Sequence, residues 1–272
     1  MNCRLTNLQL NQYINLRPIH ILPGTQSSLR KCELKDLDWV MIRENSEGEY
    51  AGQGGTTHDN TPLAVATDVS IYTHAAIERT MRFAFDVAKS RPRKLLTMVT
   101  KSNAQRHGMV LWDTVFDGVK KDYPEVKTDK AIVDAMTVRM VLNPASLDTI
   151  VATNLHGDIL SDLAAALSGG IGIAPSSNLD PTRSCPSMFE PIHGSAPDIM
   201  GKGIANPIGT FWCAAEMLRW LGETEAGDAL LKAAENITEA GIKTRDVGGR
   251  ATTDEVTQAL IKEVKQLLKS WY

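Results

Sequence analysis

Two aspartates four residues apart, Asp158 and Asp162, form the clearest chemical signal in the sequence. They lie in NLHGDILSDL (154–163), where a predicted strand ends at Asn154, a short turn follows and a helix starts at Asp158. Side chains at this spacing share one helix face, so the two carboxylates could supply oxygen ligands to a hard divalent cation. The spacing also fits an N-cap aspartate followed by a second one on a solvated face.

Three basic residues are predicted to lie at the carboxyl ends of strands: Arg17, Arg43 and Lys101. In α/β proteins a crevice at that edge of the sheet binds small ligands. An arginine can hold a carboxylate through two hydrogen bonds, and a desolvated lysine can accept and release a proton. Each residue taken alone fits a surface ion pair, but the set favours an anionic substrate.

Tyr50 and Asp134 are weaker candidates. Tyr50 ends RENSEGEY (43–50) and could act as a phenolic acid, although a packed loop aromatic fits the position equally well. Asp134 stands in the apolar run VDAM (133–136), where a charge normally needs a partner or a metal.

The glycines do not form a Rossmann fingerprint. SGGIG (168–172) follows a predicted helix rather than a strand, and GQGG (52–55) has the wrong spacing. The loop 193–198 instead offers backbone amides and the carboxylate of Asp198. Such a carboxylate could bind the ribose hydroxyls of NAD and would repel the extra phosphate of NADP.

The elements that must position these residues alternate between short β-branched runs and amphipathic helices, which predicts an α/β fold. Strands are predicted over 38–43, 94–100 and 147–154, and helices over 73–90, 109–123, 158–167, 210–221, 226–240 and 253–268. The stretches 52–55, 168–175 and 191–207 are predicted to be loops because they are rich in Gly and Pro.

Composition narrows the class of protein. The formal net charge of −3 does not favour nucleic-acid binding, and no apolar run approaches the length of a membrane span. The four cysteines, Cys3, Cys32, Cys185 and Cys213, match no zinc site and are predicted to be free thiols. No secretory signal is recognisable near Met1, so we expect a cytoplasmic protein.

Taken together, the motifs resemble the β-decarboxylating dehydrogenases, the isopropylmalate and isocitrate dehydrogenase family, from about residue 11 to the end of the chain. The resemblance rests on LRP (16–18), RENSEGEY (43–50), TKSN (100–103), VDAMTVRM (133–140), NLHGDILSDL (154–163) and FEPIHGSAPDIMGKGIANP (189–207). Within the family the chain is most similar to the tartrate and D-malate branch, through RENSEGEY and SRPRKLLTMVTKSN (90–103).

The resemblance implies a role for each matching residue. Arg17 and Arg43 would bind the substrate carboxylates, Lys101 would be the base, and Tyr50 the acid. Mg²⁺ or Mn²⁺ would be held by Asp134, Asp158 and Asp162. NAD would contact Glu190, His193, Gly194, Ser195, Ala196, Asp198 and Asn206.

The family fold implies a three-layer α/β/α body with a mixed sheet and two lobes. Residues 1–22 and 169–272 would form the large cofactor-binding lobe, and residues 23–168 the smaller lobe that binds substrate and metal and dimerises. The family's first strands and glycine-rich loop have no counterpart before LRP, so we expect an N-terminally truncated member. We expect a homodimer with a shared active site, in which Lys101 and Asp134 come from the neighbouring subunit.

The implied function is NAD- and metal-dependent oxidation, with or without decarboxylation, of a small 2-hydroxy dicarboxylic acid such as tartrate or D-malate. The position aligned with a further substrate arginine falls at Ser27, which favours a small substrate. Two alternatives stay open: a 3-isopropylmalate dehydrogenase, and a catalytically inactive fragment of the family. Neither a nucleic acid nor a membrane is an expected partner.

Overall fold

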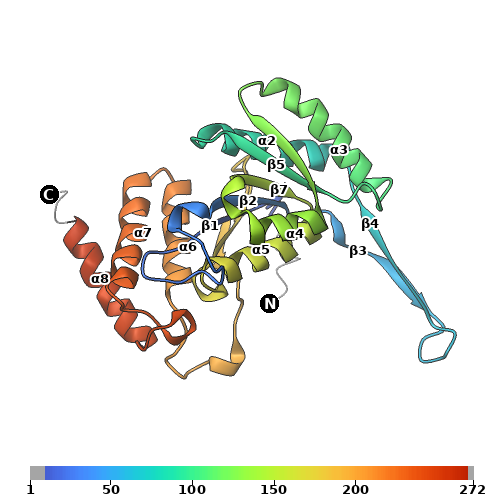
Figure 1. Cartoon of the computed structure of the whole chain (residues 1–272). Helices are drawn as coiled ribbons and strands as arrows, with labels where there is room; N and C mark the ends of the chain where they lie inside the picture. The colour runs from blue at the N-terminus through green and yellow to red at the C-terminus, as the bar shows by residue number, and fades with distance from the viewer. Residues whose placement is uncertain (1–9, 269–272) are drawn as a thin grey trace.

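The computed structural model describes residues 10–268, which are organised around a seven-stranded mixed sheet (Figure 1). The strand order is β6-β5-β7-β2-β1-β8-β9. These strands are β1 (Ile14–His20), β2 (Asp38–Glu44), β5 (Leu95–Thr100), β6 (Lys127–Ile132), β7 (Thr149–Ala152), β8 (Pro175–Leu179) and β9 (Met188–Pro191). The four strands from β6 to β2 are parallel neighbours, whereas β1 runs antiparallel to both β2 and β8.

Helices cover both faces of the parallel half of the sheet. Helices α2 (His74–Ser90) and α3 (Gly108–Val119) bury their apolar side chains against Ile42 and Met98. Helices α4 (Val133–Leu142) and α5 (Asn154–Ser168) pack on the neighbouring strand residues Met41 and Val99. Because successive residues of a strand point to opposite faces, the two helix pairs lie on opposite sides.

Three further helices, α6 (Ile208–Trp220), α7 (Thr224–Glu239) and α8 (Thr253–Leu268), form a separate layer at the β8–β9 end (Figure 1). Their apolar side chains, including Trp212 of α6, enclose a third core with Leu22 and Ile173. The expected α/β architecture with a mixed sheet between helices is therefore confirmed. The two-lobe division stays a prediction; its first boundary falls in the connection between β1 and β2, which are adjacent strands of this one sheet.

Three local predictions were wrong. Helix α5 begins at Asn154 rather than Asp158, because the Thr153 side chain accepts a hydrogen bond from the His156 amide and caps the helix earlier. Arg17 lies in the middle of β1, not at a carboxyl end. Residues 52–55 belong to a strand rather than a loop, since β3 (Gly48–Thr57) pairs with β4 (Val65–Ile71).

The β3–β4 hairpin projects away from the body of the molecule (Figure 1). Every residue of β4 is exposed, including Val65, Val69 and Ile71. Sterics require glycine at one position of β3. A Cβ on Gly54 would lie 2.1 Å from the Thr67 carbonyl oxygen of β4. Glycine therefore permits the close approach of the two strands.

The described part of the chain agrees with two further expectations. Cys32, Cys185 and Cys213 are free thiols, whereas Cys3 lies outside the described residues. Between residues 10 and 268, the helices are all too short or too polar to cross a bilayer. The predicted location in the cell stays a prediction.

Asp148 ties three elements together at the amino-terminal edge of the parallel strands. Its side chain is 1% exposed, and it accepts hydrogen bonds from Arg91 Nε at 2.6 Å and from the Leu95 amide at 3.3 Å. Its carbonyl oxygen accepts from the Val40 amide. The carboxylate therefore fixes the end of α2 and the start of β5 against β7.

We expect Asp148→Ala to lower the free energy of unfolding by about 3 kcal/mol, because it leaves the partly buried Arg91 guanidinium without its main counter-ion. Urea denaturation followed by circular dichroism measures this. Glu125→Ala is the control, since it removes a carboxylate from the exposed pair with Lys89, 2.8 Å away. Equal losses in the two variants would contradict the importance assigned to Asp148.

Candidate active site

Arg17 and Arg43 lie side by side because β1 and β2 are antiparallel. Arg43 pairs with Asn15, two residues before Arg17, so all three side chains lie on one face of the sheet. Each arginine side chain is only 10% exposed. Burial, followed by the charge of Arg43, lowers the pKa of Arg17 to about 10, while Asp158 and Asp162 oppose that shift.

Helix α5 supplies the two carboxylates that face these cations. Asp158 Oδ1 lies 2.5 Å from Arg43 Nη1 and 3.6 Å from Arg17 Nη2, and Asp162 Oδ1 lies 3.7 Å from Arg17 Nη1. The Tyr50 hydroxyl donates a 2.8 Å hydrogen bond to Asp158 Oδ2. The structure thus brings Arg17, Arg43, Tyr50 and both helix aspartates together.

Gly157 allows the helix to approach Arg43. A Cβ at this position would lie 2.7 Å from Arg43 Cγ and 2.8 Å from Arg43 Cβ. Asn154, at the start of the same helix, accepts hydrogen bonds from Arg43 Nε at 3.1 Å and Nη2 at 2.7 Å. Within HGD (156–158), Gly157 therefore lets the helix backbone lie against the Arg43 side chain, and Asp158 supplies the opposite charge.

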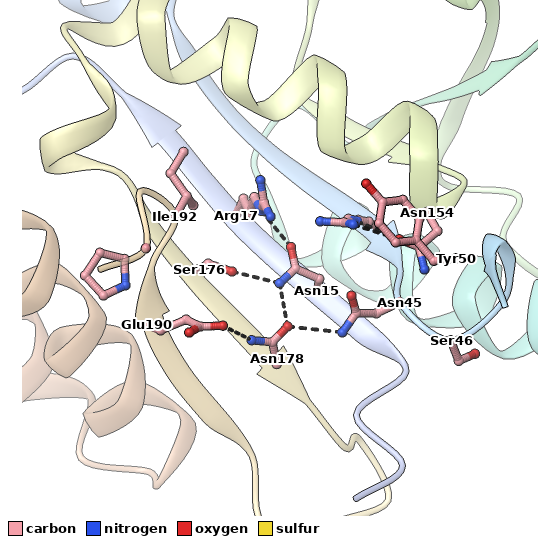
Figure 2. Close-up of a pocket in the computed structure, with 13 residues that line it drawn as sticks. Asn15, Arg17, Asn45, Ser46, Tyr50, Asn154, Ser176, Asn178, Glu190 and Ile192 are labelled. Carbon is pink, nitrogen blue, oxygen red and sulfur yellow. Dashed lines mark hydrogen bonds between the residues drawn. The ribbon is translucent and has the colours of Figure 1, made fainter. Parts of the chain in front are cut away.

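Arg17, Arg43, Tyr50 and Asn154 border a pocket of about 250 Å³, here called the polar pocket (Figure 2). Figure 2 shows Asn15, Ser176 and Asn178 lying between Arg17 and Glu190. The lining consists of Asn15, Arg17, Arg43, Asn45, Ser46, Tyr50, Asn154, Ser176, Asn178, Glu190, Pro191, Ile192 and Gly194. Two guanidinium groups on a small polar cavity suit a ligand with two carboxylates.

Lys101 and Asp134 form a second group, apart from the polar pocket. Lys101 follows β5 and Asp134 opens α4 after the neighbouring strand β6, so the two side chains meet, with Nζ 2.6 Å from Oδ1. This hydrogen bond lowers the pKa of Asp134 below its ordinary value. Lys101 is therefore the partner of this carboxylate, and the Asp134 side chain is 70% exposed.

The donor set of one chain fits a divalent cation only in part. Asp158 and Asp162 provide carboxylate oxygens on one helix face, and the Asp162 side chain is 66% exposed and open to a cation. Within residues 10–268, however, no three His, Cys, Asp or Glu side chains converge on one point. The third predicted ligand, Asp134, would have to come from another copy of the chain.

A larger pocket of about 560 Å³, the loop pocket, lies beside the polar pocket and shares Gly194 with it. Its walls are Ile171, Gly172, His193, Gly194, Ser195, Ala196, Ile199, Met200, Gly201, Gly203, Ile204, Ala205, Asn206, Arg245, Asp246 and Thr253. Side chains are small along most of this surface, and Gly194, Gly201 and Gly203 adopt positive φ with open space around them. The size and the exposed backbone fit a nucleotide cofactor.

Five of the seven residues predicted to contact NAD line the loop pocket: His193, Gly194, Ser195, Ala196 and Asn206. Glu190 lines the polar pocket instead, and Asp198 is not among the residues that line either cavity. Ser27 lies elsewhere, because its hydroxyl donates to the Leu167 carbonyl near the end of α5. That the lack of an arginine at this position favours a small substrate stays a prediction.

Sequence reasoning missed several polar residues of these walls. Asn15 could have been found, because it is two residues before Arg17 and shares its face of a strand. Ser176 and Asn178 are 2% and 3% exposed on β8, but PSSNL reads as a polar loop in the sequence. Asp246, whose carboxylate accepts a 2.9 Å hydrogen bond from Asn206, lies in a separate turn.

Comparison with known proteins places this geometry in a family. The protein-family model described as isocitrate/isopropylmalate dehydrogenase matches residues 4–263 of the chain. A probable tartrate dehydrogenase/decarboxylase of Agrobacterium vitis is 61% identical over 254 residues, which cover 93% of this chain and 71% of that protein. The decarboxylating D-malate dehydrogenase of Escherichia coli K12 is 45% identical over 93% of this chain and 72% of its own length.

The fold agrees with the sequence comparison. The crystal structure of isocitrate dehydrogenase from Methylococcus capsulatus matches with a TM-score of 0.90 at 35% identity, covering 98% of this chain and 77% of that one. The relatives are dehydrogenases and decarboxylases, which supports an oxidoreductase. The resemblance drawn from the motifs is confirmed: the chain belongs to the isocitrate/isopropylmalate dehydrogenase family.

Proposed function

We propose that this protein oxidises a small 2-hydroxy dicarboxylic acid such as tartrate or D-malate, using NAD and Mg²⁺ or Mn²⁺, with decarboxylation of a suitable product. The observation that carries the proposal is the pair of buried arginines that line a pocket of about 250 Å³ and are in contact with Asp158 and Asp162 of α5. Similarity to tartrate and D-malate dehydrogenases supports the substrate class.

Substrate recognition follows from charge and size. Arg17 and Arg43 would each hold one carboxylate, and both are fixed before the substrate arrives by hydrogen bonds from Nε. A divalent cation held by Asp158, Asp162 and a third aspartate would supply Lewis-acid stabilisation of negative charge on the substrate hydroxyl oxygen. NAD, bound along the loop pocket with Glu190 towards the polar pocket, would supply the hydride acceptor.

Two side chains would move protons. Lys101 would accept the proton of the substrate hydroxyl as hydride leaves the adjacent carbon. Tyr50 would deliver a proton to the carbon from which carbon dioxide has departed. The Tyr50 hydroxyl is already oriented by its hydrogen bond to Asp158, and the residue lines the polar pocket. We place the substrate carbon beside it.

The separation of Lys101 and Asp134 from the polar pocket leads us to propose a homodimer with shared sites. Helix α4 carries exposed apolar side chains at Val138, Val141 and Leu142, and α5 carries one at Ile159, next to Asp158. Pairing these faces between two copies would bury them and bring the partner subunit's Lys101 and the partner subunit's Asp134 towards the helix aspartates. The apolar edge of β4 would extend the interface.

We expect the purified chain to reduce NAD with D-malate or tartrate in the presence of Mn²⁺. With 3-isopropylmalate, kcat/KM should be at least about tenfold lower, because the polar walls offer little for an isopropyl group. Absorbance at the NADH band measures this, and excess EDTA should abolish the rate. Preference for 3-isopropylmalate would favour that alternative. No turnover of any of these acids would favour the inactive-fragment alternative.

Shared sites predict complementation between two inactive variants. Lys101→Ala and Asp158→Asn should each lower kcat at least about a hundredfold. When the two are co-expressed, half of the dimers are mixed and each has one intact site, so about a quarter of the wild-type rate should return. A mixture as inactive as its parents, with mixed dimers shown by mass spectrometry, would contradict shared sites.

Gly157→Ala tests the seating of Arg43. The new methyl group would contact Arg43 Cβ and Cγ, so we expect KM for the diacid to rise about tenfold through a displaced guanidinium. Gly118→Ala in α3 is a matched control, because a Cβ there meets nothing within 4 Å and should only favour the helix. An unchanged KM in Gly157→Ala would mean that Arg43 does not hold the substrate.

A further inference from the structure

A continuous series of side-chain hydrogen bonds joins Arg17 to Glu190 across three strands (Figure 2). Arg17 Nε donates to Asn15 Oδ1 at 2.7 Å, and Asn15 Nδ2 donates to Asn178 Oδ1 at 2.8 Å. Asn178 Nδ2 donates in turn to Glu190 Oε1 at 3.1 Å. The series therefore connects the guanidinium of β1, through β8, with a carboxylate of β9.

Side branches hold the two asparagines from other directions. Asn15 Nδ2 also donates to Ser176 Oγ at 2.7 Å, and Asn45 Nδ2 donates to Asn178 Oδ1 at 3.1 Å. Asn15, Ser176 and Asn178 are each no more than 3% exposed. Water therefore cannot readily replace a missing partner, and a lost hydrogen bond would leave a buried polar atom unpaired.

The direction of the series is fixed by its two ends. A guanidinium only donates and a carboxylate only accepts, so each amide between them has one favourable orientation. Reversing Asn178 would turn its oxygen towards the oxygen of Glu190 and its NH₂ group towards those of Asn15 and Asn45. Glu190 thus determines the orientation of Asn178, and Asn178 that of Asn15.

We infer that Asn178 is a positioning residue for Arg17, acting through Asn15. With Nε held by Asn15, the two terminal nitrogens of Arg17 are turned towards Ser161, Asp158 and Asp162 on helix α5. The inference rests on the proposed function, in which Arg17 binds a substrate carboxylate. It adds that the orientation of this arginine depends on Asn178, a residue of β8 in the wall of the polar pocket with only 3% of its surface exposed.

The test is Asn178→Ala, measured in two ways. In steady-state kinetics with D-malate, NAD and Mn²⁺, KM for the diacid should rise about tenfold and kcat should change less than about threefold, because substrate binding is lost uniformly. In ¹H–¹⁵N spectra of the free protein, the Arg17 Nε–H signal, assigned by its absence in Arg17→Lys, should exchange with water about tenfold faster. That change corresponds to one charge-assisted hydrogen bond.

Asn236→Ala is the matched control. Asn236 Nδ2 also donates to a glutamate carboxylate, Glu263 Oε1 at 2.7 Å, but between α7 and α8 and away from both pockets. It should leave KM and the Arg17 signal as in the wild type. Asn178→Ser is a second variant should Asn178→Ala fail to fold, since its hydroxyl is too short to reach Asn15 and Glu190 together.

The two readouts separate this inference from the proposed function. A wild-type protein without turnover would contradict the function, yet faster Arg17 Nε–H exchange in the Asn178 variants would still support positioning. An active wild type whose folded Asn178 variants keep their KM and their Nε–H protection would overturn the inference alone. A change of equal size in Asn236→Ala would overturn it too, because a general loss of stability would then explain the effect.

Discussion

Arg17 and Arg43 bring two like charges into a part of the sheet that is largely closed to water, and the surrounding structure compensates for both. Burial and mutual repulsion each disfavour the charged forms, as the lowered pKa of Arg17 reflects. Asp158 lies within 3.6 Å of both guanidinium groups, and the opposite charge offsets much of that penalty. Both guanidinium groups also border the polar pocket. The proposed recognition of a dicarboxylate would therefore use arginines that the fold already holds in place through their own counter-ions.

The direction of β1 places the two arginines beside helix α5. A purely parallel sheet would bring loops and helix starts to a common edge, but β1 runs antiparallel to β2 and β8. Its middle, rather than its end, therefore faces the first turns of α5. That placement allows Asn15, Arg17 and the residues of β8 to form one polar surface within the sheet. The pocket is lined by strand side chains of fixed register, so its shape depends little on loop conformation.

The sequence predicted what local pattern determines and missed what strand pairing determines. The spacing of Asp158 and Asp162 located both carboxylates, and apolar periodicity located α2, α3 and the helices from α5 to α8 with errors of a few residues at their ends, but α4 was missed. Neither signal could place Arg17 in mid-strand, because LRP contains a proline, which has no backbone N–H to donate within a sheet. Asn178 was hidden for a similar reason: a buried strand made of Pro, Ser and Asn has no hydrophobic alternation. Its polar side chains are tolerated only because partners on β1 and β9 satisfy them.

The position of Lys101 and Asp134 shows how far a single chain can assemble this site. They end adjacent strands, β5 and β6, whereas Arg43 lies on β2, with β7 between β2 and β5. Lys101, after β5, is therefore two strand spacings of about 4.8 Å from Arg43, and Asp134, after β6, is three. In the proposed dimer, a second copy of the chain would supply the proton acceptor. Sheets of this kind are rigid. The exposed apolar side chains of α4 lie on the helix that carries Asp134, and the exposed Ile159 of α5 is next to Asp158. In the proposed dimer, these exposed apolar side chains would be covered by the second copy beside the site that it completes.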